Sequence, residues 1–452
     1  MRLLPLLLST SVTGLLVGAA ACGSSNDDQP AGTGGTTTTS TSTTSNSGGS
    51  GAGKPTETVT GDVAVDTTLG SDKNWLLEGT VRVLDGATLT IEAGTTVLGD
   101  KASMGTLVIE QGGSIVADGT ASEPIVFTSA LPAGQRAPGD WGGLVVLGRA
   151  PINEPGGTAS VEGFTTAETY GGTDPNDSSG SLSYLRIEFS GIEIAPDNEI
   201  NGLTLAGVGR GTSIDHVMVR HTLDDCFEWF GGTVDASYLI CDSNGDDGFD
   251  IDQGYVGRLQ FLFLHQSTDS DSGIEADNDT SNPAVTPVTD PTIYNVTLCG
   301  PDTAVPNQQS GMLLRRGFNG TFANFVVTGF EGGVDVRDKP FTDVALTHAT
   351  FFGNAPENVA YAEDGSNTAE QADDDAGFDE RAWFAGGAGN TETDPGLVDC
   401  FGATPDARPG TELTGTAPPA DGFFDASAGY RGAFRDGSDA WATGAWVSWA
   451  PN

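Results

Sequence analysis

The chain has 452 residues, of which 65 are Gly and 23 are Pro, and only 18% are charged. Turn residues at this frequency favour many short elements over long helices. Acidic residues number 62 against 19 basic ones, which gives a formal net charge of −43. Nucleic acid is excluded as a partner, because its phosphates would be repelled, and cations are favoured.

The N-terminus has the pattern of an export signal. Arg2 is followed by an apolar stretch that Pro5 and several Ser and Thr residues interrupt, and small residues lead up to Cys22. This order is typical of a signal peptide over residues 1–21, whereas a membrane-spanning helix needs about 20 apolar residues. The end of the stretch resembles a bacterial lipobox, which implies a lipid on Cys22. Gly23 replaces the Asp of many inner-membrane lipoproteins, which implies a surface-exposed outer-membrane lipoprotein.

Residues 22–57 are mostly Gly, Ser, Thr and Asn after the lipidated Cys. A segment of this composition cannot bury enough apolar surface to order itself. We therefore predict a disordered tether over 22–57, a folded body over 58–355, and a loop-rich C-terminal capping region over 356–452.

The body consists of short β-rich runs separated by Gly and Asp, with no sustained helical periodicity. Predicted strands include 87–91, 106–109, 125–127 and 144–147. Six segments align on one template, and they begin at Ser213, Asp235, Arg258, Thr292, Thr321 and Thr342. One column of this alignment holds Val217, Leu239, Leu262, Val296, Phe325 and Leu346. The next holds Val219, Cys241, Leu264, Leu298 and Val327, and His348 interrupts it.

A second series of segments lies between these six. Its first apolar column holds Phe227, Phe249, Ile274, Met312 and Val334. Its second holds Trp229, Ile251, Ala276, Leu314 and Val336. A repeat near 22 residues with longer spacers indicates stacked coils with loop insertions. We predict an all-β fold, a right-handed parallel β-helix with at least two strands per coil. A β-propeller would need blades of roughly 40 residues.

Several stretches resemble a family of bacterial surface lipoproteins with pectate-lyase-like right-handed parallel β-helices. They are residues 105–119, 124–129, 139–148 and 224–232, and the ending 429–434 with Trp441 and Trp446. The resemblance covers most of residues 58–452. It implies a fold and a surface location and supplies no activity.

Alternation in the second series leaves two outward columns, which hold Glu228, Asp250, Glu275, Leu313 and Asp335, and Phe230, Asp252, Asp277, Arg315 and Arg337. Stacked strands lie about 4.8 Å apart, so these carboxylates converge. The turns before the strands add Asp224, Asp225, Asp242, Asn244, Asp246, Asp247, Asp269 and Asp271. Oxygen ligands at this density suit Ca²⁺. The predicted ligands are Asp250, Asp252, Glu275, Asp277, Asp242, Asn244, Asp246 and Asp247. Solvated or turn-capping carboxylates remain the alternative.

The same outward face offers candidates for catalysis. Arg315 and Arg337 follow the acidic residues, and carboxylates beside an Arg resemble the layout of polysaccharide lyases on this fold. Carboxylate pairs such as Asp250 and Glu275 also resemble those of β-helical glycoside hydrolases. Charge balance against the acidic face is the structural alternative for both Arg residues. Because a fold does not establish a function, enzyme activity stays open.

Four Cys residues of an exported chain suggest disulfides, with three possible pairings, and buried free thiols are the alternative. Cys226 opens one strand and Cys241 closes the next, so a U-shaped coil brings both to the same end. This predicts a Cys226–Cys241 bridge, which leaves Cys299 and Cys400 to pin the C-terminal region to the coils.

Aromatic residues complete the inventory of binding groups. Six Trp residues could stack on sugar rings, with core packing as the default alternative: Trp141, Trp229, Trp383, Trp441, Trp446 and Trp449. The sequence thus predicts a surface binding or structural module that uses Ca²⁺ and binds an extracellular polysaccharide or another surface protein. A polysaccharide lyase or glycoside hydrolase is the alternative.

Overall fold

The computed structural model describes residues 53–164, 168–195, 198–279, 281–302, 310–338, 343–360, 375 and 377–452. The predicted signal peptide, Cys22 and residues 22–52 of the predicted tether lie outside the described residues, as does Thr342. The described residues belong to one compact unit. Within the described part of the chain, no helix is long and apolar enough to cross a membrane.

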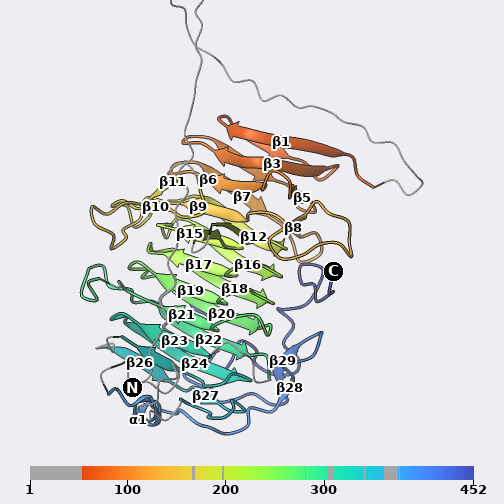
Figure 1. Ribbon diagram of the computed structural model, residues 1–452. Coiled ribbons are helices and arrows are strands. Elements are labelled where there is room, and N and C mark those ends of the chain that lie inside the picture. The colour runs from red at the N-terminus through yellow and green to blue at the C-terminus, as the bar shows by residue number, and fades with distance from the viewer. Residues whose placement is uncertain are drawn as a thin grey trace, which may run out of the picture. The chain divides into compact units, whose positions relative to one another are not determined.

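Stacked parallel strands build the body (Figure 1), and 23 of them are connected by hydrogen bonds. They form three faces, one more than the minimum of two strands per coil that the sequence predicts. The first face contains β2 (Thr67–Leu69), β4 (Thr88–Ile91), β7 (Ser114–Asp118) and β26 (Val344–Thr347). The second contains β5 (Thr96–Gly99), β8 (Ile125–Ser129) and β27 (Thr350–Phe351).

The third face carries the second series of segments. It contains β6 (Thr106–Ile109), β9 (Leu144–Leu147), β15 (Leu203–Ala206), β17 (Phe227–Phe230), β19 (Phe249–Asp252), β21 (Ile274–Ala276), β23 (Met312–Arg315) and β25 (Asp335–Arg337). Each strand of this face pairs in parallel with the next. The predicted right-handed parallel β-helix is confirmed.

Eight longer strands bend from one face into the next. β12 (Gly180–Glu188), β16 (Ser213–Arg220), β18 (Asp235–Asp242), β20 (Arg258–His265), β22 (Thr292–Cys299) and β24 (Gly320–Thr328) join the first face to the second. β1 (Thr56–Val63) and β3 (Asn74–Val83) join the second face to the third. In β3 the bend is made by Gly79, whose φ of 65° costs a glycine little.

In the six strands between the first and second faces, a residue with a side chain adopts this left-handed conformation. These residues are Tyr184, His216, Tyr238, Phe261, Asn295 and Asn324, with φ between 50° and 65°. The first four stack on one another, with ring centroids 4.3, 4.4 and 4.7 Å apart. Left-handed backbone costs about 1–2 kcal/mol for such residues, and the stacked rings offset part of this cost.

His348 shares this bend, with a φ of 52°. The predicted column that joins Phe325 to Leu346 is therefore wrong. Leu346 pairs with Phe322 on the first face, and Phe351 pairs with Val327 on the second. The sequence repeat pairs Thr321 with Thr342, whereas in the structure Thr321 pairs with Ala345, three residues later. The apolar pattern did not predict this shift, because it does not show where a bend in left-handed conformation occurs.

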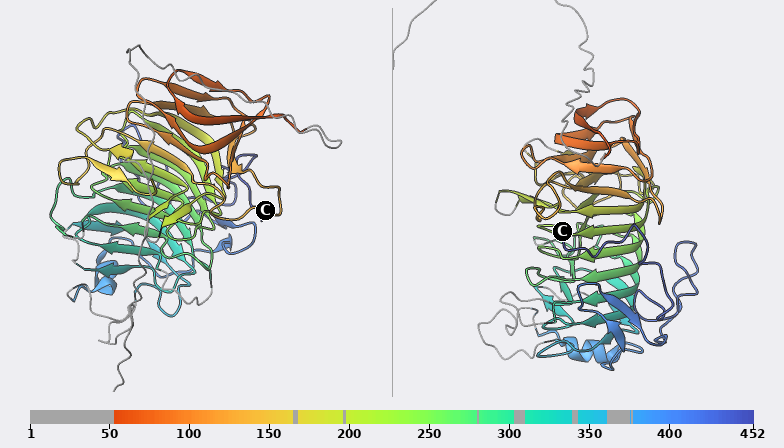
Figure 2. Two further views of the ribbon diagram at one scale, coloured as in Figure 1. Left: turned by 45° about the horizontal axis from the view of Figure 1, so that its top comes forward. Right: turned by 90° about the vertical axis from the view of Figure 1, so that its right-hand side faces the viewer.

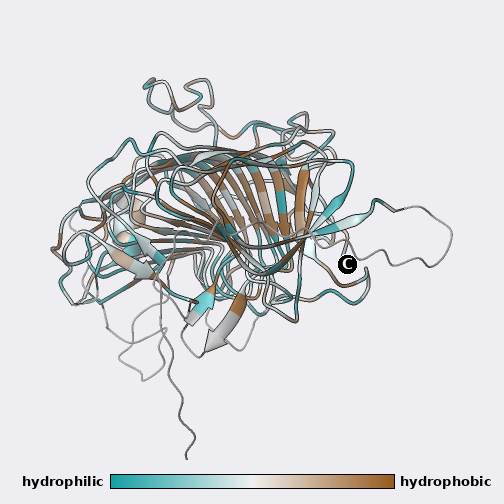
Figure 3. Cartoon of the chain, turned by 90° about the horizontal axis from the view of Figure 1, so that it is seen from above, coloured by the Kyte–Doolittle hydropathy of each residue, from teal (hydrophilic) through white to brown (hydrophobic). Residues whose placement is uncertain are grey.

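Apolar residues of all three faces are buried in one continuous core. Hydrophobic residues recur on the stacked strands in Figure 3. The strand register confirms the predicted columns that contain Phe227 and Trp229. It also confirms those that contain Val217 and Val219, except in the last coil. The residues in them that belong to strands are almost completely buried. Parallel coils satisfy the backbone of neighbouring coils, so the described stack of 23 strands has its unpaired edges at its two ends.

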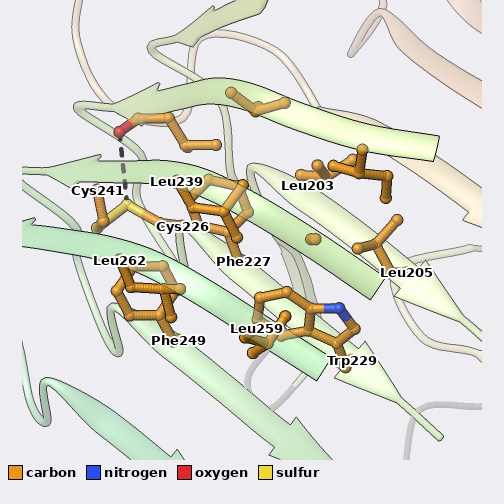
Figure 4. Packing of buried hydrophobic residues seen from close by; sticks show 14 of the residues in the cluster. Leu203, Leu205, Cys226, Phe227, Trp229, Leu239, Cys241, Phe249, Leu259 and Leu262 are labelled. Carbon is orange, nitrogen blue, oxygen red and sulfur yellow. Dashed lines mark hydrogen bonds between the residues drawn. A yellow bond between two sulfur atoms is a disulfide. The ribbon is translucent and has the colours of Figure 1, made fainter. Parts of the chain in front are cut away.

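Both predicted disulfides are present. Cys226–Cys241 has a Cα–Cα distance of 5.7 Å and lies inside the core among Phe227, Leu239 and Leu262 (Figure 4). Cys299 pairs in register with His265 on the outer side of the second face, where it bonds to Cys400 across a Cα–Cα distance of 5.9 Å. The second bridge therefore attaches the C-terminal region to the coils.

The C-terminal region contains α1 (Glu380–Gly386) and the hairpin of β28 (Leu397–Asp399) and β29 (Asp406–Pro409). It then runs back beside the stacked strands (Figure 2). Backbone N–H of Ala445 bonds to the carbonyl of Ala121, and Asn452 contacts Gly134 and Arg136. Two further hairpins are inserted between coils, β10 (Ala159–Val161) with β11 (Glu168–Tyr170), and β13 (Ile192–Ala195) with β14 (Asn198–Ile200).

Candidate metal centre

The outer side of the third face carries the predicted column of acidic residues. Glu228 on β17 pairs in register with Asp250 on β19, and Asp250 pairs with Glu275 on β21. Leu313 and Asp335 continue the column on β23 and β25. Alternation along each strand buries one neighbour in the core and turns the carboxylate outward. The sequence therefore predicted this column correctly.

The turns that lead from the second face into the third add a second set of carboxylates. Asp224 and Asp225 precede β17, Asp246 and Asp247 precede β19, and Asp271 precedes β21. Asp225 accepts a hydrogen bond of 2.7 Å from the backbone N–H of Asp247. Asp247 in turn accepts one of 2.5 Å from the N–H of Ser272. These bonds stack the turns directly above one another, so their acidic side chains gather.

Eight carboxylates from these turns and strands form what we call the acidic cluster: Asp224, Asp225, Glu228, Asp246, Asp247, Asp250, Asp271 and Glu275. They make four overlapping groups of three, and within each group one oxygen per residue lies within 4.8 Å of the others. Asp250 belongs to two groups, one with Asp225 and Glu228 and one with Asp247 and Glu275. Spacing of this kind allows a cation to contact several oxygens at once.

Burial of the acidic cluster disfavours its negative charge. Asp225, Glu228 and Asp247 are only 5%, 6% and 4% exposed. Burial, reinforced by neighbouring carboxylates, raises the pKa of each of these three groups well above its ordinary value. The same causes raise the pKa of Asp250 to about 7 and that of Asp224 to about 8. Without a counter-ion, the cluster therefore retains protons near neutral pH.

Two groups in and beside the acidic cluster lack a hydrogen-bond partner. The Oδ1 atom of Asp250 is buried and unpaired within the described residues. Asn244, which is 1% exposed, donates from its amide to the carbonyl of Asp246, while its Oδ1 has no partner in the same part of the chain. Buried acceptors without a donor cost free energy, and a cation would satisfy such oxygens.

Arginines border the acidic cluster on the side of its last coil, which contains β21. Arg315 forms ion pairs with Glu275 and, over 2.8 Å, with Asp277. Arg316 also contacts Asp277. Asp277 and Asp252 lie in the neighbouring outward column and outside the four groups. Burial raises the pKa of Asp252 to about 6 and that of Asp277 to about 9.

Asp242 lies apart from the acidic cluster, at the outer end of the second face. It stands in a ladder of alternating charge in which Glu188, Arg220, Asp242 and His265 pair in register. Its two oxygens lie 3.3 Å from Nε of Arg220 and 2.9 Å from Nδ1 of His265. The two candidate arginines are also paired, Arg315 as described and Arg337 with Asp335 over 2.7 Å.

The predicted ligand set thus contributes Asp246, Asp247, Asp250 and Glu275 to the acidic cluster. As ligands it leaves out Glu228, which the sequence places in the outward column, and Asp224, Asp225 and Asp271, which it places in the turns. A repeated motif also marks three of these four residues. Residues 224–228 read Asp-Asp-Cys-Phe-Glu, and residues 246–250 read Asp-Asp-Gly-Phe-Asp. The repeat of this motif at the coil period places an acidic turn and an acidic strand position together in each coil.

A family model described as a pectate-lyase-like beta helix domain matches residues 61–396. Searches of curated proteins and of solved structures return no significant match. The matched stretch starts within β1, ends before β28 and includes the whole acidic cluster. It covers more than half of the chain and coincides with the parallel coils. The chain belongs to the pectate-lyase-like β-helix family.

Proposed function

We propose that this protein is a lipid-anchored surface β-helix that acts as a binding or structural module, with Ca²⁺ bound in the acidic cluster. The observation that carries the proposal is the gathering of eight carboxylates on three successive coils, with oxygens of each group within 4.8 Å. Turn and strand positions supply them together, so the backbone presets their spacing. The ligands of the module are glycans or another surface protein.

Electrostatics support a cation in this position. Carboxylates this close repel one another, and buried ones have also lost their hydration. Arg315 pairs with Glu275 and Asp277 at one end of the cluster, while Asp225, Glu228 and Asp247 are buried toward the other end. Ca²⁺ accepts 6–8 oxygen ligands in flexible geometry, which suits a set of carboxylates from several coils.

The location rests on the N-terminal sequence. An interrupted apolar stretch and small residues before Cys22 support export and lipidation, and Gly23 supports the outer membrane. The net charge of −43 supports a partner other than nucleic acid. A tether between Cys22 and the first strand would hold the coils clear of the lipid headgroups.

Catalysis by the same face draws no support from the arginines. A lyase of the layout that the sequence suggests needs an Arg that can take a proton from the substrate. Arg315 is held by Glu275 and Asp277, and Arg337 by Asp335. Both guanidinium groups are therefore already engaged by carboxylates of this chain. We therefore propose binding and do not extend the proposal to bond cleavage.

Thermal unfolding in Ca²⁺ and in NaCl of equal ionic strength tests the cation. A ligand at a hundredfold excess over its Kd stabilises the native state by about 2.7 kcal/mol. With a Kd of roughly 0.1 mM, Ca²⁺ at about 10 mM reaches this excess. Replacing Asp247 and Asp250 with Asn should abolish the Ca²⁺-specific rise in Tm, while Asn retains the acceptor for Ser272.

A double variant of exposed acids, Asp118→Asn with Glu123→Gln, is the matched control and should keep the full rise in Tm. Equal melting of the wild type in Ca²⁺ and in matched NaCl would refute the cation site. Equal loss of the rise in both double variants would show a general charge effect instead of a site.

A further inference from the structure

A concave site separate from the acidic cluster lies where the C-terminal region covers the second face. Its cavity has a volume of about 230 Å³. Phe263 of β20 and Phe434 form apolar parts of the lining and are 1% and 4% exposed. Trp449 also lines it, with its ring 6.0 Å from that of Phe263 in an edge-to-face arrangement.

Trp449 differs from the other tryptophans that the sequence offers for sugar stacking. Trp141, Trp229 and Trp446 are completely buried, so they serve the core and the cover of the second face. Trp441 lies against Phe434, with ring centroids 5.0 Å apart. Trp449 is half-buried and lines a cavity, so a ligand can reach part of its indole ring.

Charged side chains line the same cavity. Asp406 and Arg408 form a two-point ion pair, with N–O distances of 2.7 and 2.6 Å. Arg408 also donates to the carbonyls of Gly437 and Asp439, which holds its guanidinium in place. A carboxylate has about four acceptor positions, so the carboxylates of Asp406 and Asp439 can accept further hydrogen bonds from a ligand.

We propose that this cavity is a subsite for one neutral pyranose ring of a glycan. The apolar C–H face of such a ring packs on the indole of Trp449, and its hydroxyl groups donate to Asp406 and Asp439. The volume supports a single ring, since sites for drug-sized ligands have roughly 300–1,000 Å³. The inference rests on the proposed function in one respect, because it takes glycans as the class of ligand.

Charge decides which kind of sugar fits. The residues that line the cavity include two acidic ones, Asp406 and Asp439, and one basic one, Arg408. Since Arg408 is committed to Asp406 and two backbone carbonyls, an acidic sugar would meet unpaired negative charge. Like charges placed together across an interface are strongly unfavourable. Neutral hexoses are therefore preferred over uronic acids.

Saturation-transfer NMR with methyl glycosides of glucose, galactose, mannose and N-acetylglucosamine tests the subsite, with galacturonate as the acidic comparison. At least one neutral glycoside should bind with a Kd on the order of 1 mM, as expected for one ring. Trp449→Ala should weaken this binding about tenfold through loss of the aromatic contact. Ala442→Phe, which fills the cavity and leaves Trp449 in place, should weaken it as well.

Trp383→Ala, a half-buried Trp of α1 that does not line the cavity, is the control and should bind as the wild type does. The inference would be overturned if no neutral glycoside bound at concentrations well above this Kd. Unchanged binding in both cavity variants, or a preference for galacturonate, would overturn it as well. Each measurement is repeated with EDTA. Loss of sugar binding alone would leave the Ca²⁺ proposal standing, because the Tm shift reports on a different part of the molecule.

Discussion

Asp225 and Asp247 occupy equivalent positions on successive coils, and the carboxylate of Asp225 accepts a 2.7 Å hydrogen bond from the backbone N–H of Asp247. One acidic side chain thus orients the turn that presents the next. The same residues that we propose as cation ligands also hold the stacked turns in register. The two roles can be separated by substitutions that remove either the charge or the acceptor.

Asp225→Ala should lower the free energy of unfolding by about 1–3 kcal/mol, because it leaves the buried N–H of Asp247 without an acceptor. Asp225→Asn retains an oxygen acceptor and removes a buried group that, when ionised, is repelled by its neighbours. We expect the Asn variant to be as stable as the wild type, or more stable, in EDTA. Urea unfolding of both variants in EDTA measures the difference, and equal destabilisation by Asn and Ala would contradict the assigned hydrogen bond.

Stability should depend on pH in the direction opposite to that of ion-paired carboxylates. Burial raises the pKa of Asp250 to about 7 and of Asp224 to about 8, whereas the unfolded chain loses these protons above about pH 4. Between about pH 4 and pH 8 the unfolded state binds fewer protons, so the free energy of unfolding falls as the pH rises. Below about pH 4 both states are protonated and this penalty is absent.

The measurement is Tm against pH in EDTA and again in Ca²⁺. We expect a fall in EDTA and a smaller fall in Ca²⁺, since the cation replaces the protons. The double variant Asp224→Asn with Asp250→Asn should flatten the profile in EDTA. A Tm in EDTA that rises between about pH 5 and pH 8 would show that these groups are ionised in the folded protein.

Membrane attachment should depend on Cys22. In cells that process lipoproteins, Cys22→Ala should release the protein from the membrane fraction, because two acyl chains or an equivalent pair of signals are needed for stable anchoring. Cys299→Ala serves as a control that removes a different Cys and leaves attachment unchanged. Equal membrane retention of Cys22→Ala and the wild type would place the anchor elsewhere.

The disulfide between Cys299 and Cys400 should stabilise the C-terminal region strongly, since it closes a sequence separation of 101 residues. On the chain-entropy account a loop of about 100 residues contributes about 4.7 kcal/mol. Replacing both residues with Ala should lower the free energy of unfolding by several kcal/mol and make residues after 400 the first to be cut by protease. The pair Cys226→Ala with Cys241→Ala, which lies in the core, should leave those residues protected.

Much of the fold follows from local pattern. An in–out alternation and a period near 22 residues place Glu228, Asp250 and Glu275 in one outward column, because stacked parallel coils repeat the facing of each position. The pairing of Cys226 with Cys241 follows from the same geometry. By contrast, the division of the first series of segments between the first and second faces was not predicted, because the bends at residues such as His216 and Tyr238 carry no Gly or Pro.

The sequence by itself determined the parallel β-helix and the outward acidic column, since both depend on contacts between equivalent positions of adjacent coils. Only the tertiary structure decided which acidic residues share a site. Asp242 is close in sequence to Asp246, yet it ends β18 on the second face and pairs with Arg220, while Asp246 lies beyond the turn beside Asp224. The chain passes from the second face to the third between these two residues. Backbone conformation and packing determine where a coil bends, and the apolar repeat of the sequence does not predict that position.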